Sequence, residues 1–149
     1  MVLDFGGVLD GYCSDLTRTV AVGTPDAEAR RVYSAVHDAQ QAAIAAVRPG
    51  VETSSVDAAA RAVLEERGLG HAFGHGTGHG LGLDVHEQPR ITRPRPDVPP
   101  ILLEPGMVFT IEPGAYLAGW GGVRIEDDVL VTESGCELLT TSPRDLLTR

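Results

Sequence analysis

The residues with the clearest chemical potential lie in one histidine- and glycine-rich stretch, positions 75–89. It contains His75, His79 and His86, three of the five histidines in the chain. Imidazole titrates near neutral pH and is the commonest side-chain ligand of borderline metal ions. Glycines at every second position from 74 to 82 disfavour a regular helix and let the backbone approach a ligand closely. Taken alone, the stretch fits a metal or catalytic site and, equally, a flexible loop of solvated histidines.

An N-terminal β-hairpin is the first element that would bring acidic side chains to such a site. Residues 2–9 and 12–22 are predicted to be strands because both are rich in β-branched, aromatic and other apolar residues. Asp10-Gly11 between them favours a two-residue type I′ turn, which needs positive φ at both positions. That turn places Leu9 opposite Tyr12 and so fixes the register of the whole hairpin.

In this register two carboxylates share one face of the hairpin. Asp4 faces Thr17, and Asp15 lies diagonal to Asp4 on the same face. Diagonal neighbours are roughly 7–8 Å apart, within reach of one ion cluster. Two such carboxylates repel each other unless a cation lies between them, so the pattern favours metal ligation. The alternative is that Asp4 is an edge-strand charge and Asp15 a turn residue.

A second predicted hairpin offers a second pair of acids. Residues 107–112 form one expected strand and residues 123–131 the other, with Pro113-Gly114 breaking the ladder after the first. Alternation places Glu112 and Glu126 on the face away from the apolar residues. The arrangement repeats that of the first hairpin and suggests two pseudo-symmetric halves.

Four carboxylates and one histidine form a donor set that suits two divalent ions. Because a carboxylate can bridge, five ligands can serve both ions and leave room for a water or hydroxide between them. The mostly oxygen donors favour manganese, with cobalt or zinc as alternatives, over a closed structural zinc site. The carboxylates are those of Asp4, Asp15, Glu112 and Glu126, and the histidine comes from the stretch 75–89.

Two helices are expected to support these hairpins. Thr24-Pro25-Asp26 predicts a helix start, with Thr24 as the N-cap, and the helix should run to about Val47 before Pro49-Gly50. Its predicted core stripe is Val32, Val36, Ala39, Ala43 and Val47. A second helix is expected over about 54–67, with Arg61 facing solvent.

The remaining segments are predicted to be short strands and loops. Residues 81–86 form a probable strand, residues 89–100 a proline-rich loop and residues 137–140 a short strand. His37 and His71 lie outside the histidine-rich stretch, and both are interpreted as solvated surface residues.

Composition limits the classes of function. The 149 residues suit one domain, and a formal net charge of −9 argues against nucleic acid or an anionic membrane as partner. Cys13 and Cys136 are too few for a disulfide framework, and two free thiols suit a reducing compartment. With no long apolar run or signal sequence, we expect a cytoplasmic protein that does not engage a membrane.

Several motifs together resemble the pita-bread metallopeptidases. Within that family the similarity is greatest to the Xaa-Pro dipeptidases (prolidases) and the proline-specific aminopeptidases. Methionine aminopeptidases rank second, since they lack the Thr-Arg-Thr after the second aspartate and usually follow the last glutamate with histidine. The motifs are Asp4-Phe-Gly-Gly, Gly11-Tyr-Cys-Ser-Asp15-Leu-Thr-Arg-Thr19, Gly78-His-Gly80, His86-Glu87, Ile111-Glu-Pro-Gly114 and Arg124-Ile-Glu-Asp127.

The resemblance implies a fold, a reaction and individual roles. The expected fold is α+β of the pita-bread type, a curved, mostly antiparallel sheet covered by two helices. The expected activity is a dinuclear metallo-exopeptidase that cleaves Xaa-Pro bonds of a peptide or dipeptide with a metal-bridging hydroxide. The family's ligand order, Asp, Asp, His, Glu, Glu, falls here on Asp4, Asp15, His79, Glu112 and Glu126, which are therefore the predicted metal ligands.

The same resemblance assigns the residues around the metal. Glu112 would move the proton from the attacking water to the leaving amine, and His86 would stabilise the tetrahedral intermediate. His75 would line the same pocket, and Arg124 would orient the substrate or a ligand carboxylate. Tyr116 either lines this pocket or belongs to the core.

The family pattern also implies that residues 1–149 form a single catalytic domain that is incomplete at its N-terminal side. Half of the family's fold, including a substrate histidine, precedes the first aspartate ligand. A non-catalytic metal-binding remnant is therefore the alternative function. We expect the isolated chain to cleave Xaa-Pro dipeptides poorly and to be either partly disordered around residues 1–22 or self-associated, for example as a homodimer.

Overall fold

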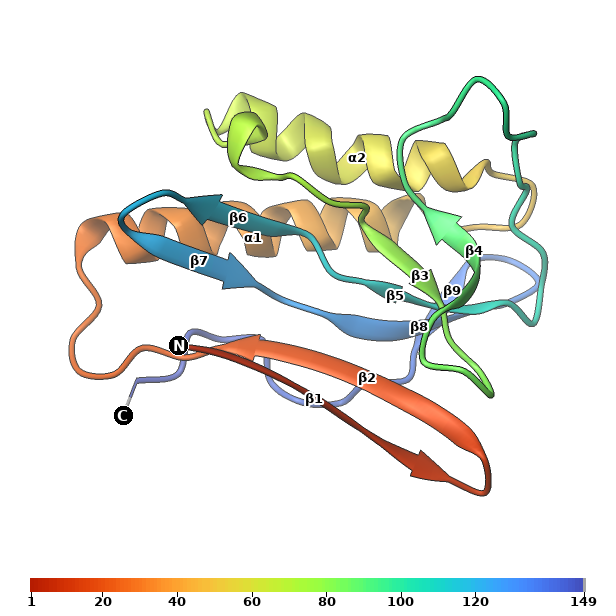
Figure 1. Ribbon diagram of the computed structural model, residues 1–149, viewed down its shortest axis with the longest axis horizontal. Helices are drawn as coiled ribbons and strands as arrows, with labels where there is room; N and C mark the ends of the chain where they lie inside the picture. Colours follow the sequence, from red (N-terminus) through yellow and green to blue (C-terminus); the bar gives the residue numbers. More distant parts are fainter. Residues whose placement is uncertain (149) are drawn as a thin grey trace.

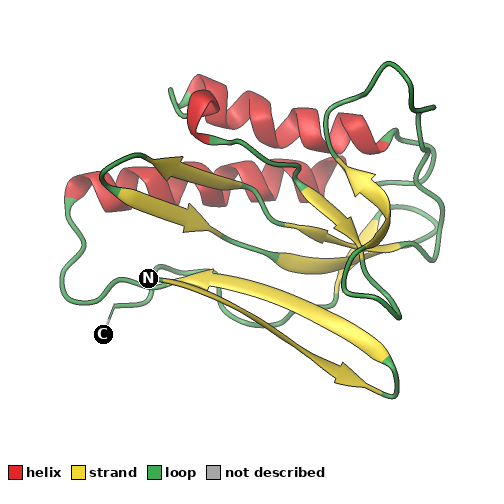
Figure 2. Ribbon diagram, in the orientation of Figure 1, coloured by secondary structure: helices red, strands yellow, loops and turns green. Residues whose placement is uncertain are grey.

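The computed structural model describes residues 1–148, which form an α+β arrangement of two helices and antiparallel ladders (Figure 1; Figure 2). No helix in this range is long and apolar enough to cross a membrane. The strands are β1 (Val2–Leu9), β2 (Tyr12–Thr19), β3 (Gly78–Gly80), β4 (Glu87–Ile91), β5 (Val108–Ile111), β6 (Gly114–Leu117), β7 (Gly121–Arg124), β8 (Asp127–Val131) and β9 (Cys136–Leu138). The helices are α1 (Ala27–Ala46), α2 (Thr53–Glu66) and a short 3₁₀ turn, η1 (Gly70–Ala72).

The N-terminal hairpin has the predicted turn and register. Asp10 and Gly11 adopt φ of 52° and 89°, as a type I′ turn requires. Leu9 pairs with Tyr12, and the ladder continues without a shift to the opposite end of the hairpin. The two strands form a sheet of their own that runs alongside β7 and β8, on the side away from α2 (Figure 1).

The central sheet has the strand order β4-β3-β5-β8-β9. The separate β6–β7 ribbon continues β5 and β8, so that one long hairpin is divided into two ladders (Figure 1). The pairings Ile111–Asp127 and Gly114–Arg124 belong to the same register, although the residues between them leave the ladder. This interruption lies at the acidic residues predicted to bind metal.

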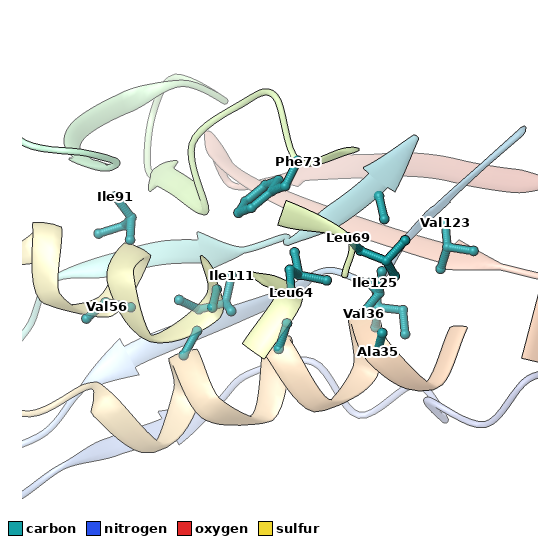
Figure 3. Packing of buried hydrophobic residues seen from close by; sticks show 14 of the residues in the cluster. Ala35, Val36, Val56, Leu64, Leu69, Phe73, Ile91, Ile111, Val123 and Ile125 are labelled. Carbon is teal, nitrogen blue, oxygen red and sulfur yellow. The ribbon is translucent and has the colours of Figure 1, made fainter. Parts of the chain in front are cut away.

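The hydrophobic core lies between the helices and the sheet (Figure 3). All five residues of the predicted stripe on α1 are buried. From α2, Val56 and Leu64 pack into the same cluster as Ile111 and Ile125 of the interrupted hairpin (Figure 3). Burying side chains of this size contributes roughly 1.5–3 kcal/mol each, so the apolar face of the hairpin is held firmly and its polar face is left for the site.

The two helices correct two predictions, one about a helix start and one about the exposure of a side chain. The N-cap of α1 is Asp26 rather than Thr24, because the Asp26 carboxylate accepts a hydrogen bond from the Ala29 amide at 2.7 Å. On α2, Arg61 does not face solvent as predicted. Its side chain is buried in an ion pair with Asp57, and it donates to the carbonyl oxygen of Phe73. Buried partners of this kind are invisible to a pattern that assigns every charge to the outer face.

Two predictions after the histidines are also wrong. Residues 81–86 form a tight loop rather than a strand: the Gly82 amide donates to the Asp84 carbonyl at 3.2 Å, and the Asp84 amide to the Glu87 carboxylate at 2.8 Å. The predicted proline-rich loop begins later than residue 89, because β4 extends to Ile91, which is fully buried. The short strand predicted at 137–140 is present as β9, shifted toward its N-terminal side.

Candidate metal centre

A cavity of about 410 Å³ lies between the N-terminal hairpin and the interruption of the long hairpin. The hairpins contribute their polar faces to it, and the loop before β4 closes one side. Its lining residues are Asp4, Gly6, Gly7, Val8, Cys13, Ser14, Asp15, His79, Val85, His86, Glu112, Arg124 and Glu126. All five predicted ligands therefore lie on one cavity.

Three of the five predicted ligands form the tightest group. One donor atom each from Asp15, His79 and Glu126 lies within 4.8 Å of the other two. Glu112 joins this group through His79, whose Nε2 is 3.4 Å from Glu112 Oε1. Asp4 lies further out: its carboxylate is exposed and forms an ion pair with Arg124.

The backbone orients the His79 ring for ligation. His79 Nδ1 lies 3.1 Å from the Gly80 carbonyl oxygen, and a carbonyl only accepts, so Nδ1 carries the proton. Nε2 then presents its lone pair to Asp15, 3.8 Å away, and to Glu112. A metal-binding histidine is commonly fixed in this way by a hydrogen bond from its other nitrogen.

Two threonines hold the glutamates in place. Thr17 Oγ1 donates to Glu126 at 2.5 Å, and Thr110 Oγ1 donates to Glu112 at 3.3 Å. The Thr110 hydroxyl also accepts from the His79 amide at 3.2 Å. Sequence reasoning missed both threonines. Each stands two residues from an acid on the same strand face, so the period of two would have found them.

The acidic side chains perturb one another. Burial and the charge of Glu112 raise the pKa of Glu126 to about 8. Burial also raises the pKa of Glu112 to about 7, although Arg124 opposes this shift. The pKa of Asp15 is raised by burial and by the Asp4 charge. Burial lowers the pKa of His79. A divalent cation bound here would offset the repulsion between these carboxylates and accept the lone pair of the His79 imidazole.

His75, Tyr116 and Arg124 form a hydrogen-bonded chain beside this group. His75 Nε2 lies 3.0 Å from the Tyr116 hydroxyl, to which Arg124 Nη1 donates at 3.2 Å. Tyr116 is 38 % exposed and so does not belong to the core, which was the alternative prediction. Arg124 Nε also lies 3.8 Å from Glu112, so this series of hydrogen-bonded side chains ends beside a predicted metal ligand.

His86 reaches the cavity from the loop over residues 81–86. Its ring centroid lies 4.2 Å from that of His79, and the side chain is exposed. The Cys13 amide donates to the Gly82 carbonyl oxygen at 2.8 Å and holds this loop against the N-terminal hairpin. The structure therefore brings His86 to the site although the predicted strand is absent.

Comparison with known proteins decides the family. The model of metallopeptidase family M24 matches residues 1–133. The chain belongs to metallopeptidase family M24. The Xaa-Pro dipeptidase of Pyrococcus furiosus is 46% identical over 147 residues, which are 99% of this chain and 41% of that protein.

Solved M24 structures have the same fold. The dipeptidase PepE of Mycobacterium ulcerans matches with a TM-score of 0.94 and 48% identity, over 99% of this chain and 39% of that one. The X-Pro aminopeptidase of Thermotoga maritima matches with a TM-score of 0.92 and 46% identity, over 99% of this chain and 40% of that one. The expected pita-bread fold is confirmed. The chain spans about 40% of the length of these M24 relatives.

A second cavity of about 570 Å³ adjoins the candidate metal centre, and the two share His79, His86, Glu112 and Arg124. Arg90 and Arg95 line its outer part. Sequence reasoning missed both, because it predicts a loop over residues 89–100 and no spacing pattern singles out an arginine there; Arg90 lies on β4 instead. Their positive charge contrasts with the acidic centre and makes the cleft bipolar.

Proposed function

We propose that this chain carries the metal centre of a dinuclear exopeptidase that hydrolyses Xaa-Pro bonds, as a single catalytic domain over residues 1–149. The observation that supports it best is the buried group of Asp15, His79 and Glu126, joined by Glu112. Asp4 completes the donor set from the cavity wall. Two divalent ions, foremost manganese with cobalt or zinc as alternatives, match these mostly oxygen donors.

The ions, when bound, supply the Lewis acidity that activates water and polarises the scissile carbonyl. The protein side chains perform the remaining steps. Glu112 accepts the proton of the attacking water and returns it to the leaving amine, a role open to a carboxylate at the cavity wall. His86, exposed beside the His79 ring, donates a hydrogen bond to the developing oxyanion.

Substrate orientation falls to the residues around the ligands. His75 and Arg124 line the adjoining cavity, and Tyr116 connects them by its hydroxyl. Arg124 also steadies Asp4 through their ion pair. A peptide bound across the cleft thus meets acidic metal ligands at one end and the Tyr116-linked pair along its side.

The arginines of the adjoining cavity favour a dipeptide. A free C-terminal carboxylate close to the scissile bond distinguishes a dipeptide from a longer peptide, and Arg90 and Arg95 offer guanidinium donors for it in this cavity. The preference is tested with an Xaa-Pro dipeptide and its C-terminal amide. Arg90→Gln should raise KM for the dipeptide about tenfold and leave the amide unchanged. Equal effects on both substrates would exclude carboxylate recognition by Arg90.

The single experiment that tests the proposed function is proline release from an Xaa-Pro dipeptide by the manganese-loaded chain completed with the N-terminal half of the family's fold, with Glu112→Gln as the matched inactive variant. Turnover that disappears in Glu112→Gln supports the proposal. Metal binding without turnover supports the alternative, a non-catalytic metal-binding module.

Both cysteines are free thiols, which supports a cytoplasmic location for either function.

A further inference from the structure

A buried ion pair on α2 lies behind the site histidines. Asp57 is 1% exposed. Arg61 binds it in a bidentate manner, with Nε 2.6 Å from Oδ2 and Nη2 3.1 Å from Oδ1. Burying two charges is costly unless their remaining hydrogen-bonding capacity is satisfied. Here that capacity is directed at the backbone of residues 73–77, immediately before His79.

Each partner fixes a different part of this segment. Arg61 donates to the carbonyl oxygens of Phe73, at 3.1 Å, and His75. Asp57 Oδ1 accepts from the Thr77 amide at 3.1 Å and from the Thr77 hydroxyl at 2.8 Å. The Arg61 guanidinium also lies over the Phe73 ring, 4.2 Å from its centroid.

The Thr77 amide is connected to the His75 ring through a single peptide unit. The N–H of Thr77 and the carbonyl of Gly76 belong to one rigid, planar peptide unit, so fixing the N–H also fixes the direction of the carbonyl. The Gly76 oxygen lies 2.8 Å from His75 Nδ1, and because it only accepts, the proton resides on Nδ1. His75 Nε2 is then left as an acceptor for the Tyr116 hydroxyl at 3.0 Å.

We propose that Asp57, held by Arg61, is a positioning residue that sets the tautomer and orientation of His75 through the peptide unit between Gly76 and Thr77. The inference rests on the proposed function for the role of His75, but the tautomer itself does not depend on that role. The same segment extends to the metal ligands, since the Glu112 amide donates to the Thr77 carbonyl oxygen at 2.7 Å.

The variants follow from the geometry. Asp57→Asn keeps the volume, but an amide accepts with only one of its terminal atoms, so it loses either the bond from Arg61 Nε or the bonds from Thr77 and Arg61 Nη2. Arg61→Met removes the guanidinium and keeps most of the apolar stem. Arg31→Met is the matched control, because Arg31 binds Glu28 in an equally bidentate pair, at 2.8 and 2.7 Å, on the exposed surface of α1.

The measurement is heteronuclear NMR of the His75 imidazole nitrogens in the metal-free chain, at a pH where the ring is neutral. The native chain and Arg31→Met should show a single tautomer protonated at Nδ1, while Asp57→Asn and Arg61→Met should show a mixture. If either α2 variant fails to fold, Thr77→Val, which removes only the hydroxyl contact to Asp57, provides the test through a smaller shift in the same direction. An unchanged tautomer in folded variants would overturn the proposal.

A second measurement tests whether the Asp57–Arg61 pair affects activity. In the manganese-loaded chain, Asp57→Asn should lower kcat/KM about tenfold without changing the bound manganese, and Arg61→Lys should recover part of the loss of Arg61→Met. If the Asp57 and Arg61 variants lose thermal stability but keep the native kcat/KM and the native His75 tautomer, the Asp57–Arg61 pair is only structural. Absence of turnover in the completed chain would refute the proposed function, and the NMR result would still decide the role of Asp57.

Discussion

Glu112 and Glu126 face each other where the long hairpin of β5–β6 and β7–β8 leaves its ladder. The pairings on both sides, Ile111–Asp127 and Gly114–Arg124, keep one register across this interruption. The backbone groups released there make other contacts: the Glu126 amide donates to the Thr17 carbonyl oxygen at 3.1 Å, which ties the second hairpin to the first. The interruption therefore joins the two hairpins at the point where their acidic side chains meet.

Removing two ligands should abolish metal binding. The chain should bind up to two manganese ions, and the Asp15→Ala, Glu126→Ala double variant should bind none with measurable affinity, because it loses two of the three donors in the tightest group. Isothermal titration and metal analysis of the purified protein measure this. Asp97→Ala, in the exposed loop before β5, is the control. Retention of both ions by the double variant would rule out the assigned centre.

Two substitutions should separate metal binding from catalysis. In a chain completed with the N-terminal half of the family's fold, Glu112→Gln should eliminate activity, while His86→Ala should keep its metal and lose roughly 10²–10³ in kcat, as expected for an oxyanion donor. Steady-state kinetics and metal content are measured on the same samples. Release of a metal ion from His86→Ala would mean that His86 is a ligand, which contradicts the proposed role.

The sequence predicted those parts of the site that depend on local rules. The Asp10-Gly11 turn sets its register by itself, and from this register follows the placement of Asp4 and Asp15 on one face. Strand alternation likewise identified Glu112 and Glu126, because the apolar residues beside them are buried. Each of these inferences needed only neighbouring residues.

The predictions that failed depend on partners far along the chain. Arg61 is buried because the carbonyl groups of residues 73 and 75 accept hydrogen bonds from it; the helical pattern shows its (i, i+4) partner Asp57 but contains no sign of these carbonyl groups. The apolar alternation of residues 81–86 suggested a strand, but Leu83 and Val85 are 67% and 42% exposed in a loop. Alternation alone does not show whether an apolar face has anything to cover it.

The metal-free chain should lose stability as the pH rises from about 6.5 to about 8. The pKa of Glu126 is about 8 in the folded chain against an ordinary value of 4.5, so in this window the folded state retains a proton that the unfolded state has lost. Glu112, with a pKa of about 7, acts in the same direction. Below this window the lowered pKa of His79 has the opposite effect, because the unfolded state takes up the proton there.

Urea unfolding in the presence of a chelator measures this effect. In the native chain the urea concentration at the unfolding midpoint should decrease as the pH is raised from about 6.5 to about 8. It should decrease less in Glu126→Gln, which carries no titrating group at that position. Manganese should raise the midpoint most at the higher pH, where the carboxylates are ionised. A midpoint that stays level or rises with pH in the metal-free chain would contradict the burial of these acids.

The face of the N-terminal hairpin opposite the metal centre should mediate self-association. Phe5, Leu9 and Tyr12 alternate onto that face and are 57%, 78% and 65% exposed, and β1 forms the outer strand of its two-stranded sheet. An apolar face beside an open strand edge is a typical site of association between copies. Phe5→Lys should weaken the dimer at least tenfold, because burying one such ring contributes roughly 1.5–3 kcal/mol. Val22→Lys, at a 79% exposed position outside the hairpin, should leave it unchanged. Light scattering over a concentration series measures both, with metal content as the check that the centre is intact. A native chain that remains monomeric across the series would show that this face does not associate.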